Sequence, residues 1–379
     1  MLSCGEASGD LYAGALLREL RARRPEVEAF GFGGPRMAAA GAELVGDFRG
    51  FSVTGLVEAL SVVPKSWRML RSLGAAARAR RPDVFVAIDF PDFNFRLLPI
   101  MRAQRVPIVY YVSPQVWAWR AGRLETIRRY VDRMLVIFPF EVALYRDAGV
   151  PVDFVGYPLL DLAAASETRE SFLTRNGLDP ARPVLALLPG SRPNELHQIL
   201  PTLVDGSILA ARQVPGLQVI VARAPSLDAG LFAPLDALRG GAIPLSVVEG
   251  HADDVLASAD AAMVASGTAT VQAALHGTPM MMVYRLAPMT YAIGRRFVRV
   301  SSYSMVNLIA GRPIVREFVQ QAFTAANVAA EAVSLLTDRE RAAEMRRNLG
   351  TVKSALGGPG ASGRAAEAVL EVARGSTRI

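Results

Sequence analysis

The stretch Val184–Leu196, VLALLPGSRPNEL, is the clearest guide to the fold of this chain. Its first five residues are all apolar and predict a buried strand. A tight turn containing Gly190 and Arg192 follows, and Pro193 then stands where the first residue of a helix favours proline. A strand, a glycine turn and a helix start in this order are typical of a parallel α/β sheet.

The turn within this stretch is also a candidate anion site. Backbone N–H groups at the start of a helix lack partners inside the helix, and the helix dipole favours negative charge there. Gly190 and Ser191 allow close approach to the backbone, and Arg192 can donate two hydrogen bonds to a phosphate. We therefore expect a diphosphate site, with an ordinary turn carrying a surface arginine as the alternative.

The composition predicts a two-domain protein. The 379 residues exceed what one hydrophobic core usually holds, and 51% of them are hydrophobic. The longest stretch without a charge, Ala261–Tyr284, is long enough to span a bilayer, but polar glycine turns divide it into strand, helix and strand. We expect no transmembrane helix, and the N-terminus lacks the basic region and apolar core of a signal peptide.

The chain offers little for a metal or cofactor. Cys4 is the only cysteine, and the three histidines are far apart and lack zinc spacing. The net charge of +7 suits an anionic membrane or a phosphorylated substrate, but no nucleic-acid recognition module accompanies it. We therefore expect no metal, no cofactor and no nucleic-acid partner.

Strands and helices alternate through both halves of the chain. After the tail of a strand at 1–5, we expect strands at 28–32, 83–88, 107–112, 134–137, 152–155, 184–188, 217–222, 245–248, 261–265 and 280–284. Ser8 is a candidate N-cap for a helix from Asp10, and the glycine stretch 31–35 is interpreted as a loop. Gly156–Pro158 resembles a hinge. The predicted domains are therefore 1–157, joined by a last helix in 358–379, and 158–357.

Polar residues stand at the ends of several predicted strands. Ligands gather at the carboxyl ends of parallel strands, so Asp89 stands where a catalytic carboxylate would stand, with a helix cap as the alternative. Glu6 and Asp10, beside two glycines at the first strand–helix junction, suit a sugar or hydroxyl site. Ser266-Gly267-Thr268 forms a second glycine junction and another candidate anion site. Asn307 is an isolated polar group among apolar neighbours.

The segment Leu56–Arg81 mixes apolar residues with cations. This pattern fits a helix lying in a membrane interface, and a core-packed helix with a solvated basic face is the alternative. The expected membrane contacts are Val63, Trp67, Arg68, Leu70, Arg71 and Leu73.

Seven motifs occur in the order seen in one enzyme family. They are GEASGD at 5–10, GGPRM at 33–37, DVFVAIDFPDFN at 83–94, YVSPQVWAWR at 111–120, LLPGSR at 187–192, ASGTAT at 265–270 and NLIAG at 307–311. In these motifs the chain resembles the lipid-A-disaccharide synthases, glycosyltransferase family 19. The resemblance implies a GT-B-like α/β fold, with two Rossmann-like parallel-sheet domains facing a central cleft.

The resemblance also implies a reaction. Diacylglucosamine would pass from its UDP conjugate to the 6-hydroxyl of diacylglucosamine 1-phosphate, forming a β-1,6 link with inversion and releasing UDP. Asp89 would be the base, and Arg192 would stabilise the departing diphosphate. Asn307 and Ser266–Thr268 would hold the nucleotide, while Glu6 and Asp10 would face the substrates. The enzyme would sit peripherally on the cytoplasmic face of the inner membrane of a Gram-negative bacterium, with a homodimer as a further expectation.

The sequence departs from the family pattern in four places. The first strand is short, Tyr157 replaces a usual histidine, and Val306 replaces a usual proline. Gln272 stands where the family usually has a glutamate that grips the ribose hydroxyls, so the charge-assisted part of that contact is lost.

Two other functions remain open from the sequence. A UDP-sugar 2-epimerase on the same fold would also hold a nucleotide, but it gives no reason for the basic and apolar segment at 56–81. A non-catalytic lipid- or phosphate-binding protein would bind its ligand without needing Asp89.

Overall fold

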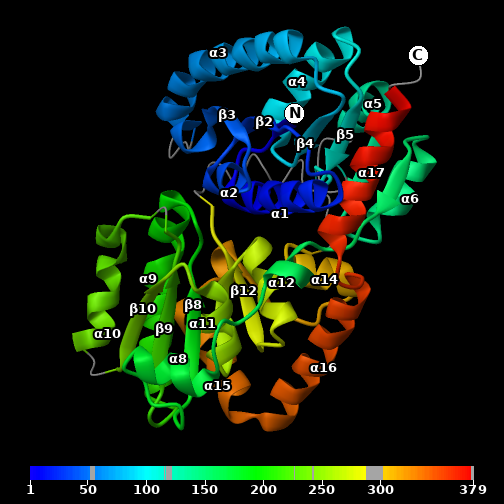
Figure 1. Ribbon diagram of the computed structural model, residues 1–379. Coiled ribbons are helices and arrows are strands. Elements are labelled where there is room, and N and C mark those ends of the chain that lie inside the picture. Colours follow the sequence, from blue (N-terminus) through cyan, green and yellow to red (C-terminus); the bar gives the residue numbers. More distant parts are fainter. Residues whose placement is uncertain are drawn as a thin grey trace. The chain divides into compact units, whose positions relative to one another are not determined.

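The computed structural model describes residues 1–51, 56–114, 116, 122–225, 227–240, 243–286 and 302–376, without the side chains of 50, 51, 56–63 and 376 (Figure 1). The chain forms two compact units. Unit 1 comprises Met1–Asp161 and Leu356–Ile379, and unit 2 comprises Leu162–Ala355. In the described ranges, no helix combines the length and apolar character that crossing a bilayer requires.

Unit 1 is built on a seven-stranded sheet in which every neighbouring pair is parallel. The strand order is β3-β2-β1-β4-β5-β6-β7. The strands are β1 (Leu2–Ser3), β2 (Phe30–Gly33), β3 (Glu43–Asp47), β4 (Phe85–Ile88), β5 (Ile108–Tyr111), β6 (Arg133–Val136) and β7 (Val152–Phe154). Strands β1, β2, β4 and β5 are buried along their whole length, as a sheet covered on both faces requires.

Helices cover both faces of this sheet (Figure 1). They are α1 (Ala7–Arg23), α2 (Pro35–Ala39), α3 (Leu56–Arg80), α4 (Pro91–Ala103), α5 (Arg123–Tyr130), α6 (Glu141–Asp147), α7 (Leu159–Leu162) and α17 (Ala361–Ser376), with the 3-10 turn η1 (Phe48–Phe51). A core lies between the sheet and helices α3 and α4, where Leu70 and Leu97 pack among Phe32, Phe85 and Tyr110. This burial of large apolar side chains is the main force holding the layers together.

Unit 2 repeats the design with a six-stranded parallel sheet in the order β10-β9-β8-β11-β12-β13. Its strands are β8 (Val184–Leu188), β9 (Gln218–Arg223), β10 (Leu245–Glu249), β11 (Ala261–Ala265), β12 (Met280–Tyr284) and β13 (Glu317–Val319). Its helices are α8 (Arg169–Arg175), α9 (Pro193–Ala211), α10 (Asp236–Gly240), α11 (Ala252–Ser258), α12 (Thr268–Leu275), α14 (Met305–Ala310), α15 (Ala325–Thr337) and α16 (Arg339–Ala355), with 3-10 turns η2 (Ala229–Leu235) and η3 (Gln320–Ala322). The expected strand–helix–strand division of 261–284 is confirmed.

Each sheet has one point where the strand order reverses. In unit 1 the chain starts at β1, winds outward to β3, and then returns to β4 on the other side of β1. Unit 2 does the same with β8 and β11. Crevices at the carboxyl ends of strands beside such a switch point are the usual ligand sites of doubly wound sheets. The loops after β1, β4, β8 and β11 are therefore the first places to look for chemistry.

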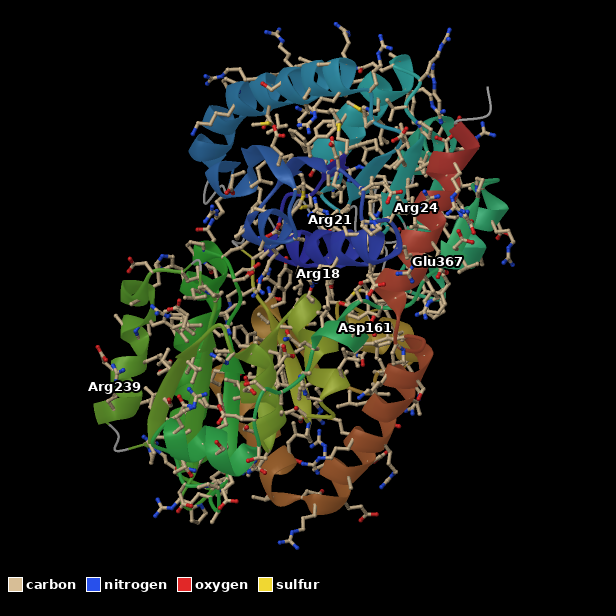
Figure 2. All side chains as sticks on the ribbon, in the orientation of Figure 1. Arg18, Arg21, Arg24, Asp161, Arg239 and Glu367 are labelled. Carbon is tan, nitrogen blue, oxygen red and sulfur yellow. The ribbon has the colours of Figure 1, made fainter. Side chains whose placement is uncertain are left out.

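The last helix returns to unit 1. Helix α17 packs against α1 and β5, and Figure 2 shows Glu367 of α17 beside α1. Glu367 pairs with Arg23 at 3.3 Å, and Glu371 pairs with Arg133 at 2.6 Å. Asp161 accepts hydrogen bonds from the N–H groups at the start of α17, at 2.7 Å from Gly360 and 3.0 Å from Ala361.

Three local features differ from the sequence predictions. The glycine stretch 31–35 is not a loop, because its residues form β2 and the start of α2. Helix α1 begins at Ala7 with Glu6 as its N-cap, so Ser8 lies inside the helix. The short strands β3 and β13 were not predicted, since three to five residues with mixed polarity give too weak a period to read.

Candidate active site

Asp89 follows β4 at the switch point of unit 1, and its backbone is strained. Asp89 and Phe90 both have left-handed backbones, with φ of +46° and +48°. Two consecutive non-glycine residues in this region cost roughly 1–3 kcal/mol each, and such strain concentrates at functional sites. The surrounding structure must therefore hold this turn in place.

Two buried side chains hold the carbonyl oxygen of Asp89. The hydroxyl of Tyr110 and the amide of Asn94 each donate to it at 2.8 Å. Burial, and then the nearby charge of Asp89, raise the pKa of Tyr110 well above its ordinary value, so its hydroxyl keeps the donated proton. Asn94 also accepts from the hydroxyl of Ser3 at 2.7 Å, which ties β1 to the Asp89 turn. The sequence did not predict that Tyr110 and Asn94 hold the Asp89 carbonyl, although the motif DVFVAIDFPDFN contains Asn94.

Phe90 is fixed by aromatic packing. Its ring stacks with Phe93 at 5.5 Å and with Phe32 at 6.2 Å between centroids. Gly5 leaves room for this ring, since a Cβ there would lie 2.2 Å from two ring carbons of Phe90. Gly5 in the loop after β1 therefore supports the turn that carries Asp89.

Asp10 has a structural role, and its predicted contact with a substrate stays a prediction. Its buried carboxylate accepts from the backbone N–H groups of Gly34, Arg36 and Met37 at 2.9–3.0 Å. It thereby caps the start of α2, so GEASGD and GGPRM are joined by hydrogen bonds. Glu6 is exposed at the start of α1, and its predicted substrate contact stays a prediction.

The predicted diphosphate site lies at the switch point of unit 2, between β8 and α9. Gly190 has φ of +119°, and a Cβ there would lie 2.5 Å from a carboxylate oxygen of Glu195. Glu195 accepts from the N–H groups of Ser191 at 3.0 Å and Arg192 at 3.3 Å, and it pairs with the Arg192 guanidinium at 2.9 Å. These two N–H groups are therefore not free, which corrects the expectation that they point at an open anion site.

A capping box at the start of α9 explains why these two N–H groups are engaged within the protein. A glutamate three residues after the N-cap commonly reaches back to the N-cap backbone. Glu195 was visible as such a signal. The side chain of Arg192 is nevertheless 57% exposed at the start of α9, so its guanidinium can reach an anion in solution.

The second glycine junction lies beside the first. Strands β8 and β11 are hydrogen-bonded neighbours, so the loop 266–268 after β11 adjoins the loop 189–192 after β8. Gly267 and Thr268 are exposed, and the Ser266 hydroxyl donates to the Tyr303 carbonyl at 3.2 Å. The structure thus brings together the two loops that the sequence proposed separately.

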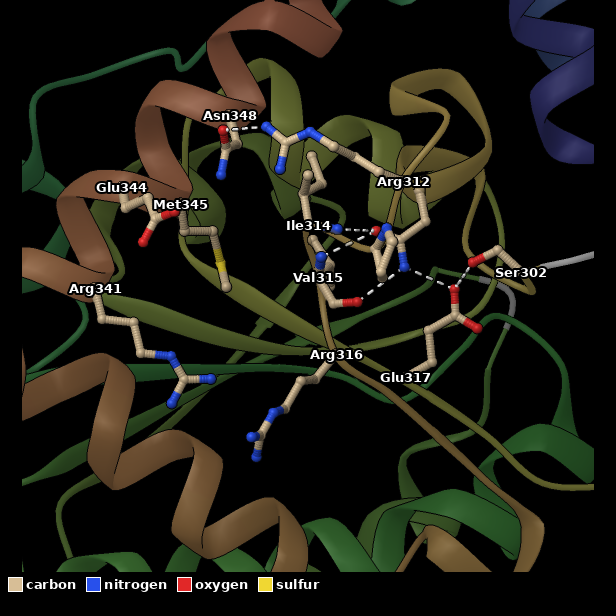
Figure 3. Close-up of a pocket in the computed structure, with 12 residues that line it drawn as sticks. Ser302, Arg312, Ile314, Val315, Arg316, Glu317, Arg341, Glu344, Met345 and Asn348 are labelled. Atoms are coloured by element: carbon tan, nitrogen blue, oxygen red, sulfur yellow. Dashed lines mark hydrogen bonds between the residues drawn. The ribbon is translucent and has the colours of Figure 1, made fainter.

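The side chain of Asn307 has a structural role, and the predicted part of this residue in holding the nucleotide stays a prediction. Its oxygen accepts from the N–H groups of Ile314 and Val315, both at 2.9 Å. Its nitrogen donates at 2.8 Å to the Val315 carbonyl and to Glu317. Ile314, Val315 and Glu317 of this network lie beside a cavity of about 510 Å³ that Arg312 and Arg341 also line (Figure 3). With every polar atom of its side-chain amide engaged within the protein, Asn307 holds these loops together.

Helix α3 carries the predicted membrane contacts, some of which are buried while others are exposed. Leu70 and Leu73 are 2% and 0% exposed and belong to the core, so they cannot touch a membrane. Trp67 is 54% exposed, and Arg68 and Arg71 are exposed as well. The helix therefore combines both alternatives: a core-packed side and an exposed side that carries an aromatic ring among cations.

Two parts of the predictions lie outside the described residues. The tryptophans Trp117 and Trp119 of YVSPQVWAWR belong to the range 117–121, and the side chain of Val63 is also not described. In the described ranges, no group of three His, Cys, Asp or Glu side chains could hold a metal ion. Burial raises the pKa of the Cys4 thiol above its ordinary range, so this buried cysteine is an unreactive core residue.

Solved structures establish the fold. The chain resembles the UDP-GlcNAc 2-epimerase from Neisseria meningitidis bound to UDP-GlcNAc, with a TM-score of 0.67, 11% identity and 98% coverage of both chains. It also resembles the calicheamicin glycosyltransferase CalG4, with a TM-score of 0.61, 18% identity and coverage of 98% and 97%. The predicted GT-B-like α/β fold is confirmed, but the fold alone does not separate a transferase from an epimerase.

Sequence comparison separates them. A family model described as lipid-A-disaccharide synthetase matches residues 1–372. The lipid-A-disaccharide synthase of Koribacter versatilis is 46% identical over 380 residues, covering 99% of this chain and 98% of the relative. That of Myxococcus xanthus is 43% identical over 372 residues, covering 98% and 97%. The chain therefore belongs to the lipid-A-disaccharide synthase family of glycosyltransferases.

Proposed function

We propose that this chain joins UDP-2,3-diacylglucosamine to 2,3-diacylglucosamine 1-phosphate through a β-1,6 link, releasing UDP. The observation that carries the proposal is the strained, clamped turn of Asp89 at the switch point of unit 1, in a chain of this family. Strain of this kind is retained where a side chain must be aimed, and a carboxylate suits the removal of a proton from a sugar hydroxyl.

The reaction is a single displacement with inversion. The 6-hydroxyl oxygen of the acceptor sugar attacks the anomeric carbon while the bond from that carbon to the UDP oxygen breaks. Asp89 takes the hydroxyl proton, and the electron pair of the broken bond leaves with the diphosphate. General base catalysis of this kind contributes typically 10²–10⁴-fold.

The leaving diphosphate is assigned to the loops after β8 and β11. Arg192 would hold its developing charge, because a guanidinium pairs with phosphate oxygens through two parallel hydrogen bonds. Gly190, Ser191, Ser266, Gly267 and Thr268 would line the same place, and Gln272 would contact the nucleoside. The N–H groups of Ser191 and Arg192 can donate to the diphosphate only if the Glu195 carboxylate moves away from them.

Association with a membrane surface is assigned to the exposed side of α3. Both substrates carry acyl chains and reside in a bilayer. Trp67 can enter the interface while Arg68 and Arg71 attract anionic headgroups, each cation being worth about 1 kcal/mol near such a surface. We assign the enzyme to the inner face of the inner membrane, as the resemblance to its family implies.

The direct test incubates the protein with both acylated substrates in mixed micelles. Formation of disaccharide 1-phosphate and UDP in equal amounts supports the transferase. Isomerised sugar nucleotide formed without the acceptor sugar would instead show an epimerase, and binding without any turnover would show a non-catalytic protein.

Arg192→Ala tests the diphosphate assignment. We expect turnover and UDP affinity both to fall, by on the order of tenfold or more, since a charge-assisted pair is lost. Arg212→Ala, an exposed arginine at the other end of α9, is the matched control for lost positive charge. Unchanged turnover and UDP binding in Arg192→Ala would show that the diphosphate lies elsewhere.

A further inference from the structure

Three polar side chains meet between α11 and α12, and only Gln272 among them has a role in the proposed nucleotide site. Gln272 on α12 and His276, the C-cap residue of that helix, lie one turn apart and both face Asp253, in the first turn of α11. The amide nitrogen of Gln272 lies 2.7 Å from Oδ1 of Asp253, and Nε2 of His276 lies 2.7 Å from the same oxygen. The side chains of Asp253 and His276 are 25% and 10% exposed.

The chemistry of this contact fixes the amide. An ionised carboxylate only accepts hydrogen bonds, so the NH2 group of Gln272 must face Asp253 and its carbonyl oxygen must point away. His276 supplies a second N–H to the same oxygen and holds the carboxylate in place. The adjacent Asp254 takes no part, since it is engaged by Ser166 and His251.

We propose that Asp253 is a positioning residue for nucleotide binding, because it orients Gln272 so that the carbonyl oxygen accepts from the ribose hydroxyls. The negative charge that a glutamate would carry at position 272 is here carried by Asp253, one side chain further from the ligand. This inference rests on the proposed function, in which Gln272 contacts the nucleoside.

The proposal predicts that installing the family's glutamate harms this protein. In Gln272→Glu, two carboxylates would meet at the distance now spanned by a hydrogen bond, and like charges that close cannot both remain ionised and in place. Adding Asp253→Asn should restore UDP binding, because the amide introduced at position 253 can donate a hydrogen bond to the new carboxylate. In Asp253→Asn alone, the orientation of Gln272 is no longer dictated, since an amide both donates and accepts.

The experiment measures UDP dissociation constants by calorimetry and kcat and KM with the acylated substrates. We expect Gln272→Glu to weaken UDP binding about tenfold, the double variant Asp253→Asn/Gln272→Glu to return within about threefold of wild type, and Asp253→Asn alone to fall between. The changes should appear in KM, with kcat little altered. Gln213→Glu, which adds the same charge at an exposed position after α9, is the matched control, and melting temperatures exclude unfolding.

The outcomes separate this inference from the proposed function. Gln272→Glu binding UDP as tightly as wild type or tighter, or a double variant no better than Gln272→Glu, would overturn the role of Asp253 while leaving the transferase intact. A wild-type protein that binds no UDP would overturn both.

Discussion

At the scale of single residues, the site depends on groups that hold a strained turn. The carbonyl of Asp89 is held by Tyr110 and Asn94, and the ring of Phe90 is stacked on two other phenylalanines. The strain of the turn is offset by these contacts, so removing one should shift the carboxylate without unfolding the unit.

Gly5→Ala tests this support. The added methyl group would lie 2.2 Å from the Phe90 ring, so the ring and the Asp89 turn must move. We expect turnover to fall on the order of tenfold to a hundredfold, since displacements near 1 Å at a catalytic group have that effect. UDP affinity should not change, because the nucleotide is assigned to unit 2.

The control for Gly5→Ala is Gly350→Ala in α16, where an added Cβ meets no atom within 4 Å. Full activity in Gly5→Ala would show that the position of Phe90 does not govern Asp89.

At the scale of elements, α1 and α2 are joined by one carboxylate. Asp10 of α1 accepts three backbone hydrogen bonds at the start of α2, two of whose donors, Gly34 and Met37, are buried. Hydrogen bonds to charged groups contribute about 1.5–3 kcal/mol each, so this joint matters for stability more than for substrate contact.

Asp10→Asn should therefore lower the free energy of unfolding by about 2 kcal/mol, since one acceptor oxygen and the charge are lost. Urea denaturation measures the change, with Asp147→Asn on the exposed end of α6 as the control. An Asp10→Asn protein with unchanged stability and a raised KM would instead make Asp10 a substrate ligand.

Membrane binding by the exposed side of α3 can be tested with one substitution. Trp67→Glu should reduce binding to vesicles of anionic phospholipid several-fold, because an interfacial ring is replaced by a charge that anionic lipid repels. Co-sedimentation measures the bound fraction. Leu70 is unsuitable as a second site, because a charge in the core would unfold the unit.

Phe140→Glu provides the comparison for Trp67→Glu, since Phe140 is the other large apolar residue exposed in the described ranges, at 37%. Equal vesicle binding by Trp67→Glu and wild type would assign this side of α3 to solvent.

At the scale of the whole molecule, the sequence predicted the architecture well because strand periods and glycine turns are local signals. The strand pattern around Val184–Leu188 and Asp83–Ile88 placed Asp89 and Arg192 at strand ends. The order of the strands within each sheet is a long-range property that no local pattern contains, and only the structure shows that both residues lie at switch points.

The structural contacts of several polar residues could not be predicted, and the reason is common to them. Asp10, Asn307 and Glu195 lie in or near glycine-containing motifs, where a polar side chain can bond either backbone groups of the protein or a ligand. Whether such a side chain bonds backbone groups or a ligand depends on partners that are distant in sequence or hidden in a turn. For the same reason the contact of Gln272 with Asp253 could not be predicted from their separation along the chain.

The measurement that tests the central claim most directly is the turnover of Asp89→Asn with saturating substrates, alongside its UDP dissociation constant. The substitution keeps the size of the side chain and removes the base. We predict a fall in kcat of roughly a hundredfold or more with UDP binding unchanged. An Asp89→Asn protein that forms disaccharide at the wild-type rate would contradict the assignment of Asp89 as the catalytic base.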